Sequence, residues 1–366
     1  MATSSMKLFT FIFLLIIVSF TASGQTKKYW KADSLFKAIY SNNAPGASIA
    51  IVQKGKTVFS NSYGIADLNT KEKISPRTNF NIASLTKQFT AIAILQLAGK
   101  GKLLLNDKLS KFFPELNKKV ADIITIQQLL THSSGIIDHY DYADTKNMKH
   151  AHIADVLNAI KNIDSTYFPP GTDYRYSNTA YCLLALIIEK LSGLSYSVYM
   201  KKNVFQPPGM KHTTIWSESE KISNKANGYE FDQTTNSFKR SGADENIFFS
   251  TEGDGGIYTS IDDYLKWMNA LQSGKIFSPV NTKRARSPQF AVNKEKKLSY
   301  GYGWFIDEST TPVKVYHSGS NGGFRSFSFT IPEEGYMVII FSNRTGINLE
   351  NLILEINKMF RPAETL

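Results

Sequence analysis

The segment at residues 79–103 has the sequence NFNIASLTKQFTAIAILQLAGKGKL. Its apolar residues recur at helical spacing and end before Gly99, a residue type that commonly terminates helices. We therefore expect a mostly buried helix here, with Ser84 at its start. The apolar positions are Phe89, Ile92, Ile94, Leu95 and Leu97.

The region before this helix predicts a β-hairpin. Residues 46–64 alternate in two runs, GASIAIVQKG and KTVFSNSYG, which join around Gly55. Alternation with such a short connection is typical of two antiparallel strands. A short helix is expected before the hairpin, at residues 32–40.

The region after the helix predicts a helical insertion and then a return to strands. Helical signals dominate residues 103–272, with clusters of Pro and Gly between them. A closing helix is expected at residues 349–360. The expected C-terminal strands lie at residues 302–307, 313–317, 324–331 and 336–342.

Together these elements predict an α+β fold. One antiparallel sheet, built from about residues 44–64 and 300–343, is flanked by helices. A helical lobe at about residues 103–272 is inserted, and the active site is expected between the sheet and the lobe.

Residues 1–24 have the three-part layout of a secretory signal peptide. Lys7 is followed by an apolar run at residues 8–20 and by small residues up to Gly24. This run is shorter than the roughly 17 to 25 residues that span a bilayer, so no stable membrane span is expected after signal removal. The prediction is an exported protein, periplasmic or secreted, with one domain at residues 25–366. The native start, Met1 or Met6, and the cleavage site stay open.

The chain of 366 residues has a formal charge of +11 and one cysteine. A positive field suits anionic surroundings such as a cell envelope or a carboxylate substrate. The lysines are scattered and no nucleic-acid-binding signature accompanies them, so no nucleic-acid partner is expected. Cys182 lies in an apolar stretch, where a small buried side chain is expected. The composition leaves the oligomeric state unknown.

The residues from Ser84 to Lys87 form an S-x-x-K motif. Residues three apart share a helix face, so the Lys87 amine is expected within reach of the Ser84 hydroxyl. A nearby base makes a serine nucleophilic, and a lysine serves as that base when burial or charge lowers its pKa. By itself the motif is a weak signal, because it arises by chance in many chains of this length.

A second motif is Tyr176, Ser177 and Asn178, which follows a Pro-Pro-Gly turn and precedes a predicted buried helix. A tyrosine there is suited to relaying protons between Ser84 and a leaving group. The Asn178 amide is suited to holding Lys87 or the substrate by hydrogen bonds. The structural alternative is a helix N-cap formed by Ser177 or Asn178.

A third motif, from His317 to Ser320, comes at the end of a predicted strand and before Asn-Gly-Gly-Phe. Gly319 is expected to let a substrate lie against the strand edge. The Ser320 N–H is expected to join the Ser84 N–H in an oxyanion hole. The structural alternative is a glycine-rich hairpin with a structural histidine.

In their order and context, the three motifs resemble those of the serine β-lactamase and penicillin-binding protein superfamily. The Tyr-Ser-Asn motif is similar to that of its class C β-lactamase-like branch, which contains β-lactamase-related serine hydrolases. LLTHSSGI at residues 129–136, PGM at 208–210 and GGIYTS at 255–260 also resemble this branch. The resemblance covers about residues 44–343.

This resemblance implies an acyl-enzyme mechanism that needs no cofactor and no metal. The implied catalytic residues are Ser84, Lys87 and Tyr176. Arg325 is a further candidate, because it carries a cation in a predicted strand eight residues after His317; its structural alternative is a surface salt bridge. The implied or candidate substrate-binding residues are Asn178, His317, Gly319, Ser320 and Arg325.

His317 departs from the pattern of the branch, because β-lactamases and carboxypeptidases have the lysine of K-T-G there. Histidine is largely neutral at pH 7 and recognises a carboxylate poorly. We therefore expect an ester or amide substrate, either a small ester or a cell-wall-type peptide including peptidoglycan-derived ones, rather than penicillin. A D-alanyl-D-alanine carboxypeptidase and a class C-type β-lactamase stay open as alternatives. From another class, a non-catalytic module that binds penicillin or cell-wall fragments is the alternative.

Two other enzyme classes lack their signatures in this sequence. An α/β-hydrolase needs G-x-S-x-G, which is absent. A zinc enzyme of the H-E-x-x-H type is also not indicated, because that motif is absent and the relevant segment has the character of a polar loop. The side chains in this segment that could bind zinc are Asp138, His139, Asp141, His150 and His152.

Overall fold

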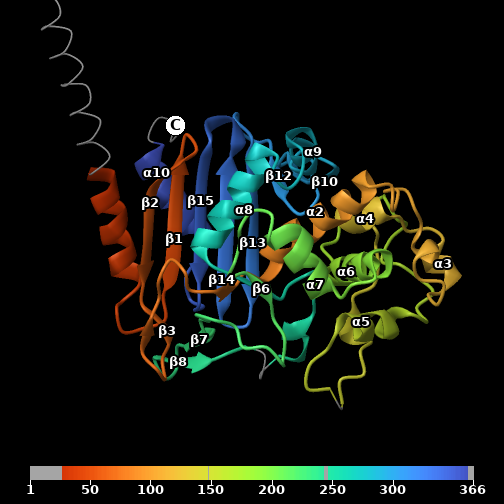
Figure 1. The fold of residues 1–366 in the computed structure, drawn as a ribbon, viewed down its shortest axis with the longest axis horizontal. Coiled ribbons are helices and arrows are strands. Elements are labelled where there is room, and N and C mark those ends of the chain that lie inside the picture. Colours follow the sequence, from red (N-terminus) through yellow and green to blue (C-terminus); the bar gives the residue numbers. More distant parts are fainter. Residues whose placement is uncertain (1–26, 147, 243–245, 362–366) are drawn as a thin grey trace, which may run out of the picture.

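The computed structural model describes residues 27–146, 148–242 and 246–361. The predicted signal peptide lies outside these residues. A central sheet has the helix at residues 27–39 and α10 (Leu349–Phe360) on one face, and α2 (Thr86–Gly99) and α8 (Ile261–Ser273) on the other. A lobe of helices extends to the right of the sheet in Figure 1. The expected α+β fold is confirmed.

The main sheet is antiparallel, and both ends of the chain contribute to it. Among the described residues its strand order is β10-β11-β12-β13-β14-β15-β1-β2, with β1 paired to β15. It is wider than predicted, because its C-terminal part begins with β10 rather than near residue 300. The strands are β1 (Ala47–Gln53), β2 (Lys56–Tyr63), β10 (Phe290–Asn293), β11 (Leu298–Tyr300), β12 (Phe305–Asp307), β13 (Lys314–Asn321), β14 (Phe324–Ile331) and β15 (Tyr336–Ser342).

The predicted hairpin is formed by β1 and β2. Its two turn residues, Lys54 and Gly55, have positive φ angles of 50° and 73°. Two-residue hairpin turns with positive φ match the twist of the flanking strands.

The central strands are buried on both faces. In β15, Val338 and Ile340 pack with the helix at 27–39 and α10, whereas Ile339 and Phe341 pack with the other core. Successive side chains on a strand point to opposite faces, so each strand supplies two separate cores. The larger core includes side chains of α2, α6 (Asn178–Ser192) and α8.

The helices of the lobe lie beside the main sheet (Figure 1). The lobe boundaries expected from the sequence, 103–272, also include α8, but α8 contacts β1 and β15 of the main sheet. The remaining helices are α3 (Lys118–Ala121), α4 (Ile126–Leu130), α5 (Ile153–Ile160), α6 (Asn178–Ser192), α7 (Tyr196–Met200) and α9 (Pro279–Ala285).

Short strands between residues 65 and 259 were not predicted. β5, β9 and β6 form one small sheet, and the Ile82 N–H donates to the Ile257 carbonyl just beyond β5. This pairing anchors the chain immediately before Ser84. The strands are β3 (Ile65–Asp67), β4 (Glu72–Lys73), β5 (Phe80–Asn81), β6 (Thr214–Ile215), β7 (Tyr229–Asp232), β8 (Ser237–Arg240) and β9 (Ile257–Thr259).

Ser84 lies in a 3₁₀ turn, Ala83–Leu85, directly before α2 rather than within it. Ala83 has φ of 48°, a conformation that costs energy for a residue with a Cβ. Nearly every side chain of α2 is buried, which agrees with the predicted buried helix.

In the described ranges, no single helix is long and apolar enough to cross a membrane. One bent pair of helices, Asn178–Ser192 with Tyr196–Phe205, has the length and the apolar composition of a membrane span. Most of its apolar side chains belong to the protein core.

Candidate active site

The turn before α2 brings Ser84 and Lys87 together. The Lys87 Nζ lies 3.2 Å from the Ser84 Oγ. It also donates to the Asn178 Oδ1 at 2.8 Å and to the backbone oxygen of Asp254 at 2.9 Å. Each proton of a charged Lys87 amine therefore has an acceptor.

Burial is the main influence on the charge of Lys87. It lowers the pKa of the amine from 10.5 to about 8, while the negative charge of Asp254 opposes this shift and raises the pKa. An amine with a pKa near 8 exchanges its proton at mildly alkaline pH, which suits a general base.

Tyr176 lies over the same amine, with its ring centroid 4.8 Å from the Lys87 Nζ. Burial raises the pKa of the Tyr176 hydroxyl well above its ordinary value of 10, and the Ser84 hydroxyl lowers that pKa by a smaller amount. The tyrosine hydroxyl nevertheless forms no hydrogen bond within the described part of the chain. Tyr176 is therefore a protonated phenol beside the serine.

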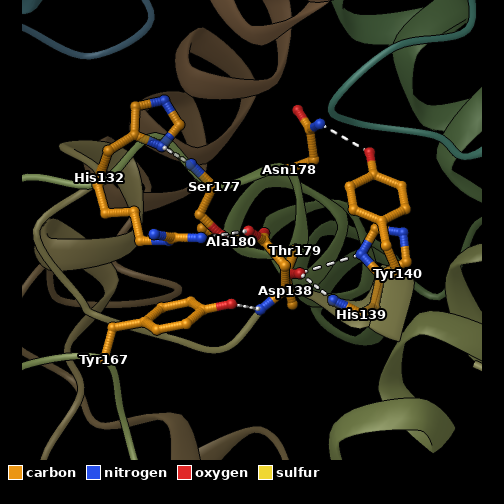
Figure 2. Close-up of polar contacts among 10 residues, drawn as sticks. His132, Asp138, His139, Tyr140, Tyr167, Ser177, Asn178, Thr179 and Ala180 are labelled. Carbon is orange, nitrogen blue, oxygen red and sulfur yellow. Dashed lines mark hydrogen bonds and ion pairs between the residues drawn. The ribbon is translucent and has the colours of Figure 1, made fainter. Parts of the chain in front are cut away.

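The start of α6 combines a helix cap with a polar side chain of the site. The Ser177 Oγ accepts a hydrogen bond from the Ala180 N–H at 3.1 Å, so Ser177 is the N-cap. Figure 2 shows the Asn178 Nδ2 donating to the Tyr140 hydroxyl, at 2.7 Å. Ser177 therefore caps the helix, and the Asn178 side chain accepts a hydrogen bond from Lys87.

Two histidine-containing loops hold this helix start (Figure 2). The His132 Nδ1 accepts a hydrogen bond from the Ser177 N–H at 3.0 Å. The His139 N–H and Nδ1 both lie 3.0 Å from the Thr179 Oγ1. Residues 132–140, which contain none of the site residues predicted from the sequence, thus support the site.

His317 lies on β13 beside Tyr176, with 6.1 Å between the ring centroids, and is 1% exposed. Its Nδ1 lies 2.6 Å from the Ser318 carbonyl oxygen, and its Nε2 lies 3.0 Å from the Tyr300 hydroxyl. A carbonyl only accepts, so Nδ1 carries the proton and Nε2 accepts from Tyr300. Burial, followed by the charge of Lys87, lowers the pKa of His317 to about 3. The ring is neutral, and both nitrogens are used inside the protein.

Gly319 lies at a close contact between β13 and the turn before α2. A Cβ on Gly319 would lie 2.5 Å from the Ile82 carbonyl oxygen and 2.3 Å from the Ser326 Oγ. The Ser326 hydroxyl also donates to the Ile82 carbonyl at 2.7 Å. The glycine thus lets β13 pack directly against the turn that carries Ser84.

The Ser320 N–H is directed toward an open edge of β13. The two-residue turn between Asn321 and Phe324 makes these two residues a hydrogen-bonded pair, and such pairs alternate along the hairpin. Ser320 therefore directs its N–H away from β14. On that side β12 pairs with β13 only as far as Tyr316.

Arg325 is not brought into the site. It is adjacent on β14 to Ser326, which faces the Ser84 turn, so its side chain leaves from the opposite face of the sheet. Its guanidinium donates to the Gly322 and Phe324 carbonyls, at 2.9 and 2.7 Å. These hydrogen bonds stabilise the turn between β13 and β14. The structural alternative was a surface salt bridge, and the guanidinium instead binds backbone carbonyls.

Asp254 is a site residue that sequence analysis missed. It is buried, and its carboxylate accepts a hydrogen bond from the Cys182 thiol at 3.3 Å. Its position directly before the Gly255-Gly256 pair was the available signal.

The expected burial of Cys182 is confirmed. In the described ranges no group of three or more His, Cys, Asp or Glu side chains is arranged to hold a metal ion.

Comparison with known proteins places this site in a family context. The family model described as beta-lactamase matches residues 27–356. A solved penicillin-binding protein from Bacillus halodurans has a TM-score of 0.76 and 28% identity, with 85% of this chain and 95% of that chain covered.

Two curated relatives are similar along most of the chain. The protein named flp from Staphylococcus aureus (strain MW2) is 32% identical over 86% of this chain and 62% of its own length. A penicillin-binding protein from Bacillus subtilis (strain 168) is 28% identical over 85% of this chain and 71% of its own length. The chain thus spans less than two thirds of the first of these relatives.

Proposed function

The chain belongs to the beta-lactamase family, and we propose that it is a serine hydrolase that acts through an acyl-enzyme on a neutral ester or amide. In this proposal Ser84 is the nucleophile, and Lys87 and Tyr176 move protons. Small esters and neutral cell-wall-type peptides are the substrate classes that fit.

In the acylation step, neutral Lys87 accepts the Ser84 proton while the Ser84 Oγ attacks the carbonyl carbon. The N–H groups of Ser84 and Ser320 stabilise the oxyanion. The leaving group departs with the Tyr176 proton, and Lys87 returns a proton to Tyr176. Water then attacks the acyl carbonyl with Lys87 as base. The acid is released, and Ser84 regains its proton from Lys87.

The observation that carries the choice of a neutral substrate is the state of His317. Its ring is buried and neutral, and both nitrogens already have partners. A substrate carboxylate would find no cation at position 317, and the Arg325 side chain lies on the other face of the sheet. A neutral acyl donor has no carboxylate, so its binding does not depend on a cation at this position.

The competing proposal is a carboxypeptidase or a β-lactamase. It is supported by the names of two relatives, which refer to penicillin binding. Substrates of both types carry a carboxylate, so the two proposals differ in the response to a new cation at position 317. A non-catalytic binding module would be acylated at Ser84 but would not release the product.

We expect His317→Lys to raise kcat/KM for a D-alanyl peptide or a penicillin, relative to a neutral nitrophenyl ester, by roughly tenfold. The reason is that a charged hydrogen bond contributes about 1.5 to 3 kcal/mol, and 1.4 kcal/mol is a factor of ten. Steady-state kinetics on the two substrate types measures the ratio.

The matched control is His152→Lys, which adds the same charge at an exposed histidine. It should leave the ratio unchanged. Wild-type enzyme that already prefers the carboxylate substrate, with no response to His317→Lys, would favour the competing proposal.

A further inference from the structure

The ring of His132 packs against the ring of Tyr176 in a tilted arrangement. Its ring centroid lies 4.3 Å from that of Tyr176, at an interplanar angle of 32°. The ring is also surrounded by Tyr181 and Tyr300, at centroid distances of 5.1 and 4.6 Å, and His132 is 0% exposed. The imidazole therefore forms one wall of the space that Tyr176 occupies.

The same residue holds the backbone on both sides of Tyr176. The Arg175 N–H donates to the His132 carbonyl at 2.9 Å. The Ser177 N–H donates to the His132 Nδ1 at 3.0 Å, as Figure 2 shows. Two hydrogen bonds and one ring contact from a single residue thus fix the position of Tyr176.

Polar contacts do not fix the Tyr176 side chain itself. Its hydroxyl has no hydrogen-bond partner within the described residues. The neighbouring groups of the site include the Ser84 hydroxyl, which lowers the pKa of the phenol, the Lys87 Nζ at 4.8 Å from the ring centroid and the His317 ring at 6.1 Å. The position of the hydroxyl near Ser84 therefore depends on how the ring and its backbone are held.

His132 performs this task as a neutral acceptor. An Nδ1 that accepts a hydrogen bond carries no proton, so the proton is on Nε2. Burial, with the charge of Lys87 as a further cause, keeps the pKa of His132 well below its ordinary value of 6.5. The Nδ1 acceptor is therefore present across the neutral pH range.

The backbone conformation of His132 limits which residues can replace it without strain. His132 has φ of 57°, which Asn and His tolerate better than most residues with a Cβ. Asn also places an acceptor oxygen near the location of the histidine Nδ1, whereas Gln places its amide near Nε2.

We propose that His132 is a positioning residue that sets the Tyr176 hydroxyl for proton transfer at Ser84. This inference rests on the proposed function, because it assumes that Tyr176 transfers protons. His132 itself touches neither the substrate nor the reacting atoms.

The test measures two rates in the full chain: phosphonylation of Ser84 by a fluorophosphonate probe, which releases fluoride, and acylation of Ser84 by a neutral nitrophenyl ester, which releases nitrophenol. His132→Gln should lower the rate by roughly 10²-fold, the cost of misplacing a reacting group by about 1 Å. His132→Asn should recover most of this loss, because it restores the acceptor for the Ser177 N–H. The wild-type pH profile should persist in His132→Asn, since His132 transfers no proton.

The Tyr176→Phe background separates positioning from general damage to the fold. There, His132→Gln should cause little further loss, because the group that it positions is gone. His152→Asn, at an exposed histidine, is the matched control and should react like wild type. Thermal melts establish that every variant is folded at the assay temperature.

Two results would overturn the inference while leaving the proposed function intact. One is normal Ser84 labelling with no rate loss in His132→Gln. The other is an equal loss in the wild-type and Tyr176→Phe backgrounds. Wild-type labelling that persists in Ser84→Ala would instead overturn the proposed function, and the inference with it.

Discussion

Lys87 is the residue on which the charge balance of the site depends. Its amine has three acceptors, one each from Ser84, Asn178 and Asp254, which stabilise the protonated form. Burial acts in the opposite direction and has the larger effect, so the pKa of Lys87 falls to about 8. The balance leaves both protonation states accessible in mildly alkaline solution.

Asp254→Asn should change this balance in a direction that the structure defines. The Asp254 charge raises the pKa of Lys87, so removing it should lower that pKa below about 8. A general base must be neutral, so the rising limb of kcat/KM with pH should move to lower pH. Steady-state kinetics with a neutral ester between about pH 6 and 9 measures the limb.

Asp122→Asn is the control for this change, because Asp122 is an exposed aspartate at the end of α3. Its profile should match wild type. A limb that stays in place in Asp254→Asn, or moves to higher pH, would show that Asp254 does not stabilise the Lys87 ammonium.

At the scale of elements, the site depends on the contact between β13 and the Ala83–Leu85 turn. Gly319 is the point of closest approach, where no Cβ fits. The Ser326 hydroxyl joins the two elements from the neighbouring strand. The turn is therefore positioned by the sheet as well as by α2.

Gly319→Ala should push the Ser84 turn away from β13. Overpacking of this kind costs about 1 to 3 kcal/mol of stability, and the displaced nucleophile should react roughly 10²-fold more slowly. Chemical denaturation and the rate of Ser84 labelling measure the two effects.

The control is Gly99→Ala at the end of α2, where an added Cβ meets no atom within 4 Å. It should leave the labelling rate unchanged. A Gly319→Ala protein that labels at the wild-type rate would show that the turn does not depend on this contact.

Several elements could be predicted from the sequence because their periodicity is strong. β14, β15 and α10 begin and end where the pattern places them. The short strands β5, β6 and β9 could not be predicted, since two or three residues show no alternation. β13 extends four residues beyond the predicted end at 317, because a glycine such as Gly319 weakens the strand pattern without ending the strand.

At the scale of the whole molecule, the site is assembled from three distant parts of the chain. Ser84 and Lys87 come from the turn and helix after the first hairpin, Tyr176 and Asn178 from the lobe, and His317 from the C-terminal strands. The sequence indicated the first four through local motifs, and their spatial proximity followed from the resemblance. Nothing local predicted the contact of Asp254 with Cys182, or that of His132 with Tyr176, because neither pair is close in sequence.

The central claim is that Ser84 is the nucleophile of a serine hydrolase. The most direct measurement is peptide mapping by mass spectrometry after reaction of the purified chain with a fluorophosphonate, in wild type, Ser84→Ala and the exposed-serine control Ser165→Ala. We predict one label, on the peptide that contains Ser84, which is lost in Ser84→Ala and kept in Ser165→Ala. A label on another residue, or one that persists in Ser84→Ala, would contradict the claim.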